Sequence, residues 1–324
     1  MNQRPIPVVQ ATPKCPQYGF LHARSQGRMI PAFIHPNATS VLRSTWDTGP
    51  QDILICTHQK VGTHLTKKYV VEILRAAGAL DLDHPAAQGD IGKSAVPWPE
   101  VMVSQSGMET FDTFLRRTEG QPRMVYTHAN ADELPVRTLH PETKVIMTYR
   151  DPKGAAVSQY HFYRNHPTLG VADDLPLSRF VDFFLEGDLY FGDYHEHVSG
   201  YFNAEQHGIR PEQLLPMRFE DLVNQKVRSV RTLSRFLLGQ LLPLEATRNV
   251  ASSTEFNTMK RAIQDNPGSF HFNPDRFFRS GKNDWAEQLS PSDVDKIDAK
   301  TLLTWGNLAR PEHHTRLNAQ SNAA

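Results

Sequence analysis

The residues best suited to binding or catalysis lie between Thr57 and Thr63, in a short segment that combines one cation, two hydroxyls and one glycine. Lys60 supplies a mobile positive charge, and Gly62 lets the backbone approach a bound group closely. An apolar run at 53–55 precedes the segment and has the length and character of a strand that is buried on both faces. This composition predicts a site for phosphate or a chemically similar oxyanion.

The segment leads into an amphipathic helix. Apolar residues recur at three- and four-residue spacing as far as Leu74, and Gly78 is the expected end of the helix. A loop at a helix N-terminus offers unpaired backbone N–H groups and the positive end of the helix dipole. The nucleoside-triphosphatase signature G-x-x-x-x-G-K-[ST] is not matched, because Lys60 precedes the single glycine. For this segment alone, an ordinary strand-to-helix turn with a solvated lysine is the alternative interpretation.

Three further strands are predicted, and each delivers a residue suited to ligand contact. They lie at 123–127 before His128, at 144–149 before Arg150, and at 213–219, ending in Phe219. Strands that alternate with helices predict a single α/β domain with a mainly parallel central sheet flanked by helices. Ligands of such sheets bind outside the carboxyl ends of the strands, so we expect these residues to converge with Lys60.

The segment that begins at Arg150 also has the chemistry of a phosphate site. Its guanidinium presents a fork of donors that matches two oxygens of one phosphate. Asp151 is a suitable N-cap and Pro152 a suitable first residue for a helix that extends to about Arg164. Ser158 lies about two helical turns beyond Arg150.

Together these segments resemble the cytosolic sulfotransferases that depend on 3′-phosphoadenosine 5′-phosphosulfate (PAPS). The first segment is similar to the family's T-Y-P-K-S-G-T-T-W, and the segment from Tyr149 to Arg164 is similar to R-N-P-K-D-V-A-V-S-Y-Y-H-F. The segment 278–285 is similar to R-K-G-x-x-G-D-W, with one residue fewer and Ser280 in place of a lysine. Shorter matches at 219–222 and 254–256 resemble Y-E-D-L and T-S-F, so the resemblance covers most of the chain.

The resemblance implies an enzyme with a P-loop-like strand-loop-helix that moves a sulfuryl group from PAPS to a hydroxyl or amine of a small organic acceptor. The product nucleotide is then 3′-phosphoadenosine 5′-phosphate (PAP). The resemblance implies that His128 is the general base and that Lys60 is the cation at the bridging oxygen. The residues that it assigns to nucleotide binding are Lys60, Val61, Gly62, Thr63, His64, Leu65, Arg150, Ser158, Phe219, Thr254, Phe256, Arg279, Ser280 and Gly281.

Two departures from the family bear on the chemistry. Tyr126 stands where the family has a lysine, and Leu65 stands where it has a tryptophan, so one cation and one stacking ring are missing. His64 or Tyr126 itself is a candidate to compensate for the lysine. The departures leave open a non-catalytic relative that binds PAPS or PAP. A P-loop kinase-like enzyme is a further alternative, although the position of Lys60 and the lack of an obvious magnesium-binding aspartate motif oppose it.

Composition narrows the range of partners. The 324 residues carry 35 basic and 35 acidic side chains, which argues against a dedicated nucleic-acid binder. Two cysteines provide no disulfide framework, and neither a membrane-length apolar stretch nor a secretory leader is evident. We therefore expect a cytoplasmic protein with no nucleic-acid or membrane partner. The expected organisation is a flexible arm at 1–17, a sulfotransferase domain at 18–311 and a disordered tail at 312–324.

The sequence also bears on metal binding and on assembly. His195-Glu196-His197 and His313-His314 lack further ligands at zinc-like spacing, so no metal is expected. The acceptor pocket is expected to come from 18–34, 80–106 and the helices around Tyr160 and Tyr190, whose composition favours a small organic acceptor. A homodimer is left open, because the chain departs from the family's dimer segment at Ala286, Ser290, Pro291 and Asp295.

Overall fold

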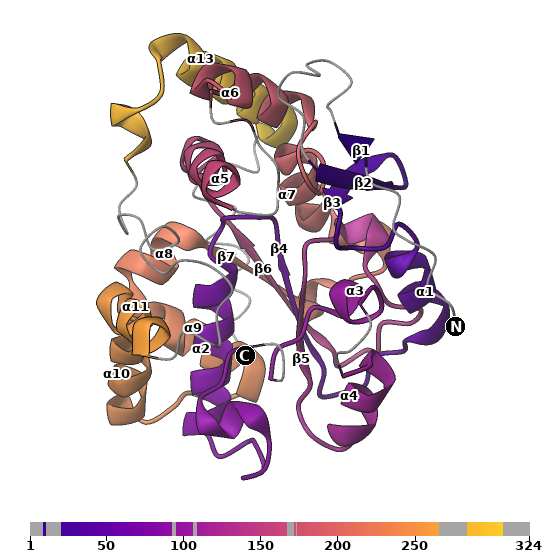
Figure 1. Cartoon of the computed structure of the whole chain (residues 1–324). Coiled ribbons are helices and arrows are strands. Elements are labelled where there is room, and N and C mark those ends of the chain that lie inside the picture. Colours follow the sequence, from indigo (N-terminus) through magenta and orange to yellow (C-terminus); the bar gives the residue numbers. More distant parts are fainter. Residues whose placement is uncertain are drawn as a thin grey trace.

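Four parallel strands form the centre of the molecule, in the spatial order β5-β4-β6-β7 (Figure 1). Within β4, Ile55 lies opposite Tyr126 of β5 on one side and opposite Ile146 of β6 on the other. The mainly parallel sheet predicted from the sequence is therefore confirmed. The four strands are β4 (Ile53–Thr57), β5 (Met124–Thr127), β6 (Lys144–Tyr149) and β7 (Leu214–Arg218). The computed structural model describes residues 9–10, 21–92, 95–105, 109–166, 172, 174–265 and 284–306.

Different helices cover the two faces of this sheet. Because alternate residues of a strand point to opposite faces, Ile53 and Ile55 join one buried cluster, whereas Leu54 and Cys56 join the other. All five residues of β4 are buried, which explains the continuous apolar run in the sequence. The first cluster contains residues of α2 (Thr63–Ala76), α9 (Lys226–Leu238) and α10 (Leu244–Ser253). The second contains residues of α5 (Pro152–Asn165), α6 (Leu177–Glu186) and α7 (Tyr194–Phe202).

Local sequence signals account for the ends of the helices that flank the predicted site. Helix α2 begins after Gly62 and is followed by Gly78, whose φ of 63° is a left-handed conformation suited to glycine. Helix α5 is capped by the Asp151 carboxylate, which accepts a 2.9 Å hydrogen bond from the backbone N–H of Lys153. Pro152 is its first residue, as predicted.

The structure contains elements that the sequence patterns did not predict. The first is a separate antiparallel sheet of β1 (Val9–Gln10), β2 (Leu21–Ser25) and β3 (Arg28–Pro31). Strand β1 lies within the predicted flexible arm and pairs with β2. The segment 80–106, which is expected to contribute to the acceptor pocket, contains a 3-10 turn and α3 (Pro99–Met102). The rest of the arm and the predicted tail at 312–324 lie outside the described residues.

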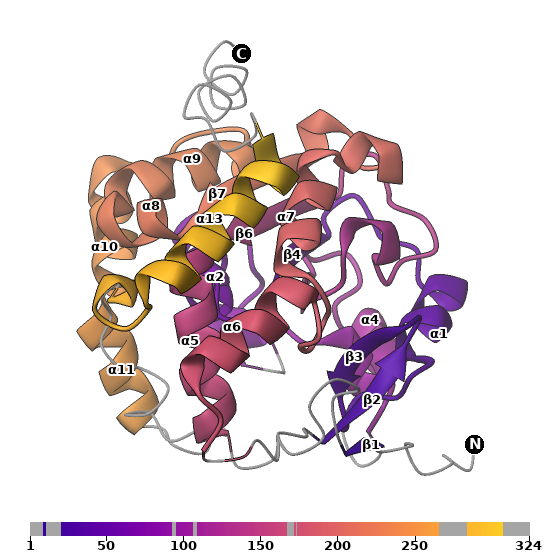
Figure 2. The same cartoon turned by 90° about the horizontal axis from the view of Figure 1, so that it is seen from above.

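The last described helix, α13 (Pro291–Trp305), was also not predicted. It packs across α5, α6 and α7, as Figure 2 shows from above. Among the helices of the described ranges, none has the length and apolar character needed to cross a bilayer. The remaining helical elements are α1 (Ala38–Thr45), η2 (Pro85–Gln88), α4 (Phe111–Arg117), η3 (Ala131–Glu133), η4 (Ala204–His207), η5 (Pro211–Gln213), α8 (Phe219–Asn224), α11 (Phe256–Asp265) and η7 (Trp285–Glu287).

Candidate functional site

The structure brings together the residues that follow the four parallel strands. His128, after β5, places Nδ1 2.6 Å from the carbonyl oxygen of Thr57 at the end of β4. The guanidinium of Arg150, after β6, donates from Nη1 to the carbonyl oxygen of Lys60 at 3.4 Å. Its Cζ lies 4.5 Å from the ring centroid of Phe219, the residue that follows β7. The predicted convergence at one edge of the sheet is confirmed by these contacts.

The loop between β4 and α2 has the backbone shape of an anion-binding turn. Lys60 and Gly62 both have positive φ, 60° and 105°, so the chain turns sharply into the start of α2. The hydroxyls of Thr57 and Thr63 lie 2.8 Å apart and connect the strand end to the first helical residue. Gly62 is the N-cap and carries no side chain, so α2 presents its first backbone N–H groups beside the loop.

Because Gly62 has no side chain, the ring of Phe219 can lie directly against the loop. A Cβ atom at this position would lie 2.6 Å from Cδ2 of Phe219, and its φ of 105° is strained for any L-residue. We expect Gly62→Ala to lower the free energy of unfolding by about 2–4 kcal/mol, because strain and a clash act together. The matched control is Gly78→Ala at the other end of α2, where φ is positive but no atom lies within 4 Å of the added Cβ.

Urea-induced unfolding of both variants measures the difference. Gly78→Ala should lose only the conformational part, about 1 kcal/mol. Equal losses in the two variants would contradict the inference that the ring of Phe219 is pressed against this loop.

The imidazole of His128 has a defined orientation. A carbonyl oxygen only accepts hydrogen bonds, so the contact with Thr57 implies that Nδ1 carries the proton and that Nε2 is the basic nitrogen. Burial lowers the pKa of His128 to about 4; the hydrogen bond to Thr57 opposes this shift, and the charge of Lys67 adds to it. The ring is therefore neutral near pH 7 and able to accept a proton.

Lys60 is a partly buried cation. Burial, with a further contribution from Arg150, lowers the pKa of its ammonium to about 7. Its Nζ lies 4.8 Å from the centroid of the Phe162 ring on α5. A cation with this environment gains stability from an incoming anion, which replaces the lost hydration.

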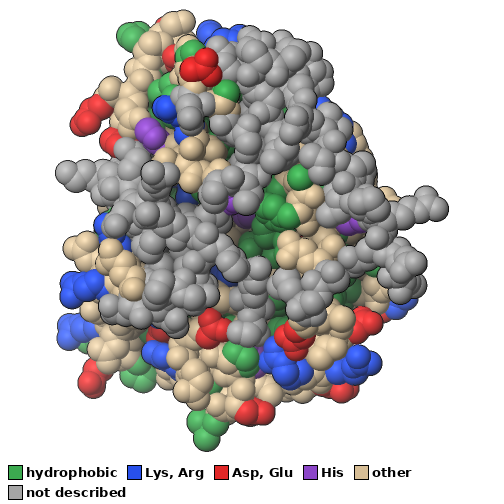
Figure 3. Space-filling view, in the orientation of Figure 1, with side chains coloured by type: hydrophobic (Ala, Val, Ile, Leu, Met, Phe, Trp, Pro, Cys, Tyr) green, Lys and Arg blue, Asp and Glu red, His purple; other side chains and the backbone are tan. Residues whose placement is uncertain are grey.

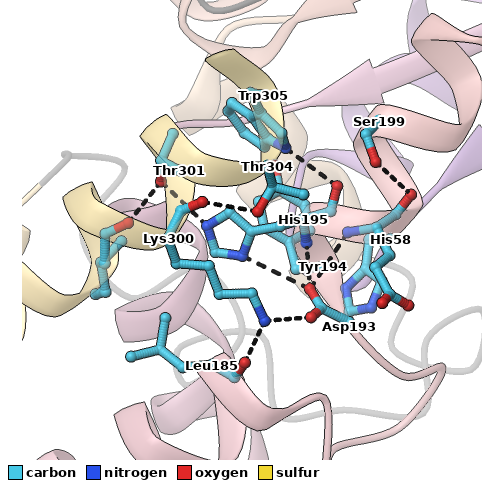
Figure 4. Close-up of polar contacts among 12 residues, drawn as sticks. His58, Leu185, Asp193, Tyr194, His195, Ser199, Lys300, Thr301, Thr304 and Trp305 are labelled. Carbon is cyan, nitrogen blue, oxygen red and sulfur yellow. Dashed lines mark hydrogen bonds and ion pairs between the residues drawn. The ribbon is translucent and has the colours of Figure 1, made fainter.

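Arg150 is held through its backbone by Tyr194 of α7. Its N–H donates to the Tyr194 hydroxyl at 2.8 Å, and that hydroxyl donates to the Arg150 carbonyl at 2.7 Å. Helix α7 in turn contacts α13, as Figure 4 shows. Lys300 forms an ion pair with the Asp193 carboxylate, and Trp305 Nε1 donates to the His195 carbonyl. Helix α13 thus supports the position of the arginine.

The two histidines of α7, at 195 and 197, have separate hydrogen-bond partners in the structure. Successive residues of a helix turn by about 100°, so these two side chains point in nearly opposite directions. His195 Nε2 contacts the hydroxyl of Thr301 at 3.1 Å, whereas His197 Nδ1 contacts Asn130 at 3.0 Å. Within the described ranges, no group of three or more potential ligand side chains could hold a metal ion. His313 and His314 lie outside those ranges.

Aromatic side chains surround His128. The ring centroids of Trp98 and Phe191 lie 4.8 and 4.9 Å from that of the imidazole, and Phe33 packs edge-on against Trp98 at 6.1 Å. Phe33 and Trp98 lie in the two segments expected to form the acceptor pocket, and Phe191 is next to Tyr190, around which a further part of that pocket is expected. Figure 3 shows hydrophobic side chains with a histidine beside them near the middle of the face seen in Figure 1. The arrangement supplies an apolar environment beside the base.

The remaining predicted nucleotide contacts are distributed as follows. Val61 is fully buried in the core, while His64 and Leu65 are half-buried on the first turn of α2. Ser158 is half-buried on α5, and Phe256 is half-buried at the start of α11.

Thr254 is buried at the C-terminal end of α10, where its hydroxyl donates to the Ala251 carbonyl at 2.8 Å. It lies near Tyr69 of α2, whose own hydroxyl donates to the Leu222 carbonyl of α8. Arg279, Ser280 and Gly281 lie outside the described residues.

Sequence reasoning missed two buried ionisable residues near His128. Lys67 is 3% exposed on α2, and Glu100 is 5% exposed on α3, where it accepts a hydrogen bond from the Thr127 hydroxyl. Burial raises the pKa of Glu100 to about 7, and the hydrogen bond from Thr127 opposes that shift. A signal for Lys67 was present, because the apolar stripe that contains Val70 and Leu74 includes position 67.

Comparison with known proteins agrees with this geometry. The sequence profile of the family described as "Sulfotransferase domain" matches residues 50–302. Sulfotransferase 1A1 of Bos taurus is 30% identical over 227 residues, covering 67% of this chain and 68% of that protein. Flavonol 3-sulfotransferase of Flaveria bidentis is 26% identical over 268 residues, covering 78% and 81%. The crystal structure of mouse sulfotransferase SULT7A1 complexed with PAP shares the fold, with a TM-score of 0.70, 23% identity, and coverage of 92% and 99%.

Proposed function

The chain belongs to the sulfotransferase family and is a sulfotransferase that uses PAPS, and we propose that it transfers the sulfuryl group to a hydroxyl or amine of a small organic acceptor with His128 as general base. The observation that carries the proposal is the meeting of Lys60, His128 and Arg150 at the carboxyl edge of one parallel sheet. Relatives named for small-molecule substrates, such as the flavonol 3-sulfotransferase, support an acceptor of that class.

His128 is suited to take the acceptor proton. Its Nδ1–H bond to the Thr57 carbonyl fixes the ring and leaves Nε2 as the basic nitrogen. In the proposed step, the acceptor proton passes to Nε2 and the acceptor oxygen or nitrogen bonds to sulfur. The bond from sulfur to the bridging phosphate oxygen breaks, and PAP leaves with that electron pair. The aromatic surroundings exclude water from the base and orient a planar or apolar acceptor.

The phosphate groups have separate candidate partners. The Lys60 ammonium and the first N–H groups of α2 would hold the 5′ phosphosulfate, where charge develops on the leaving oxygen. The Arg150 guanidinium would hold the 3′-phosphate, and its contact with Phe219 brings that ring to the nucleotide. The absence of a Cβ atom at Gly62 lets the Phe219 ring lie against the loop, beside the guanidinium that would hold the 3′-phosphate.

The direct test supplies PAPS labelled in its sulfuryl group together with a panel of phenols, alcohols and amines. Transfer of label to at least one acceptor, with no loss of rate in EDTA, is the expected result. Tight binding of PAP without transfer to any member of a broad panel would favour a non-catalytic relative. Magnesium-dependent consumption of ATP would favour the kinase-like alternative. A cytoplasmic location and the oligomeric state are separate predictions, tested by fractionation and by sedimentation.

The lowered pKa of Lys60 predicts a pH dependence of nucleotide binding. Below about pH 7 the Lys60 ammonium of the free protein is charged. Above that pH the Lys60 amine is neutral and has to take up a proton when the anion binds. Between pH 7 and pH 9 we expect the Kd for PAP to rise by up to about tenfold per unit. Calorimetric titration across this range measures the slope, and Lys60→Met should flatten it. A Kd that is constant over this range in the wild-type protein would contradict the assignment.

A further inference from the structure

Lys67 is a buried cation on the helix that carries the nucleotide loop. It lies one turn after Thr63 on α2, and its side chain is 3% exposed. Its Nζ sits 4.4 Å from the ring centroid of Tyr126 on β5. In the part of the chain that the structure describes, no carboxylate lies within ion-pair distance of this ammonium. Asp90 acts on Lys67 only as a longer-range charge that raises its pKa.

Burial of a lysine without an ion pair is costly. Burial lowers the pKa of Lys67 to about 7, which shows that the site stabilises the charged form less well than water does. Interaction with the Tyr126 ring face contributes only about 1–2 kcal/mol. An anion placed at Nζ would remove the mismatch, because a nearby opposite charge favours the ammonium.

The electrostatic neighbours of Lys67 locate it within the site. Its charge lowers the pKa of His128 and of His64. The pKa of His64 is also lowered by Lys60, so both ammonium groups act on the same imidazole. The geometry agrees, because the Tyr126 ring that Lys67 contacts lies 5.7 Å, centroid to centroid, from the imidazole of His128. Lys67 is therefore close to the proposed base. The sulfuryl group must lie between the nucleotide loop and the base during transfer.

We propose that Lys67 is the second cation of the donor site and binds the sulfuryl oxygens of PAPS. This inference rests on the proposed function, because it assigns one more contact to the same substrate. The family has a lysine at the strand position that Tyr126 occupies here. In this chain the positive charge would come instead from Lys67 on α2, beside the Tyr126 ring. Lys67 exchanges no proton in the reaction; it stabilises negative charge on the group in transfer.

The test compares two nucleotides that differ by the sulfuryl group, in the absence of acceptor. The Kd values of PAPS and PAP are measured by calorimetry for wild type, Lys67→Met and Lys67→Arg. We expect Lys67→Met to weaken PAPS binding by about 10- to 100-fold, the effect of losing one charge-assisted hydrogen bond. Binding of PAP should change by less than about twofold, and Lys67→Arg should recover most of the loss.

Lys68→Met is the matched control. Lys68 is the next residue of α2, but its ammonium pairs with Glu72 at 2.6 Å, and Glu72 retains Arg75 as a second partner. This variant should leave both Kd values unchanged. If Lys67→Met does not fold, the smaller change Lys67→Gln serves the same comparison.

Three results would overturn the inference. An equal loss for PAPS and PAP would mean that Lys67 only supports the loop. No change in either Kd would mean that it touches neither nucleotide. A higher KM for the acceptor with an unchanged PAPS-to-PAP ratio would place Lys67 in acceptor binding. Failure of the wild-type protein to bind either nucleotide would instead reject the proposed function itself.

Discussion

The His128→Ala variant is expected to lose transfer activity by at least about 100-fold, the lower end for removal of a general base, while PAP still binds. The imidazole is neutral near pH 7 and its Nδ1 is held by the Thr57 carbonyl, so in the proposed mechanism the side chain takes the acceptor proton and makes no contact with the phosphates. Single-turnover measurement with labelled PAPS gives the rate, and titration gives the Kd of PAP.

Two further variants make this result specific. His128→Asn retains a donor for the Thr57 carbonyl but has no basic nitrogen, so it should be as inactive as alanine while disturbing the aromatic surroundings less. His140→Asn is the control, because His140 precedes β6 at the opposite edge of the sheet, where its imidazole accepts a hydrogen bond from the Glu142 N–H. Full activity of His128→Asn would reject the role of this residue as base.

The second large effect is expected at Arg150. We predict that Arg150→Met weakens PAP binding by about 100-fold or more, because it removes a buried guanidinium able to make two charge-assisted hydrogen bonds to one phosphate. Adenosine 5′-phosphosulfate, which lacks the 3′-phosphate, should bind the variant and the wild type with similar affinity. This comparison separates loss of a phosphate contact from general damage to the site.

Arg218→Met is the matched control for Arg150→Met. Arg218 also lies at the carboxyl end of a strand, but its side chain is 49% exposed and pairs with Glu220. Removing an exposed charge should change PAP affinity by less than about threefold. If both variants lose the same affinity, the arginine at 150 contributes only to the general field and the assignment to the 3′-phosphate is wrong.

The elements around the site were readable from the sequence because their signals are local. Ile53–Ile55 is apolar at every position since β4 is buried on both faces, and Asp151 with Pro152 marks the start of α5. Short antiparallel strands, such as those at 21–31, have weaker patterns. Their stability comes from pairing with each other and not from their own composition.

The sequence by itself determined which residues stand at strand ends, since a parallel α/β arrangement places those ends at one edge. That reasoning was sufficient to group Lys60, His128 and Arg150. It also singled out Gly62 as a place where the backbone can approach a bound group closely, whereas the positive φ of this residue is a finding of the structure.

Only the tertiary structure decided what surrounds these groups. Trp98 and Phe191 reach His128 from distant segments, and Tyr194 holds the backbone of Arg150 from α7. The placement of Lys67 against a ring of β5 likewise depends on how α2 packs over the sheet. Such contacts join residues far apart in the chain, and no local pattern specifies which distant side chain will fill a given position. The chemistry at the strand ends was thus predictable, whereas its electrostatic and apolar environment was not.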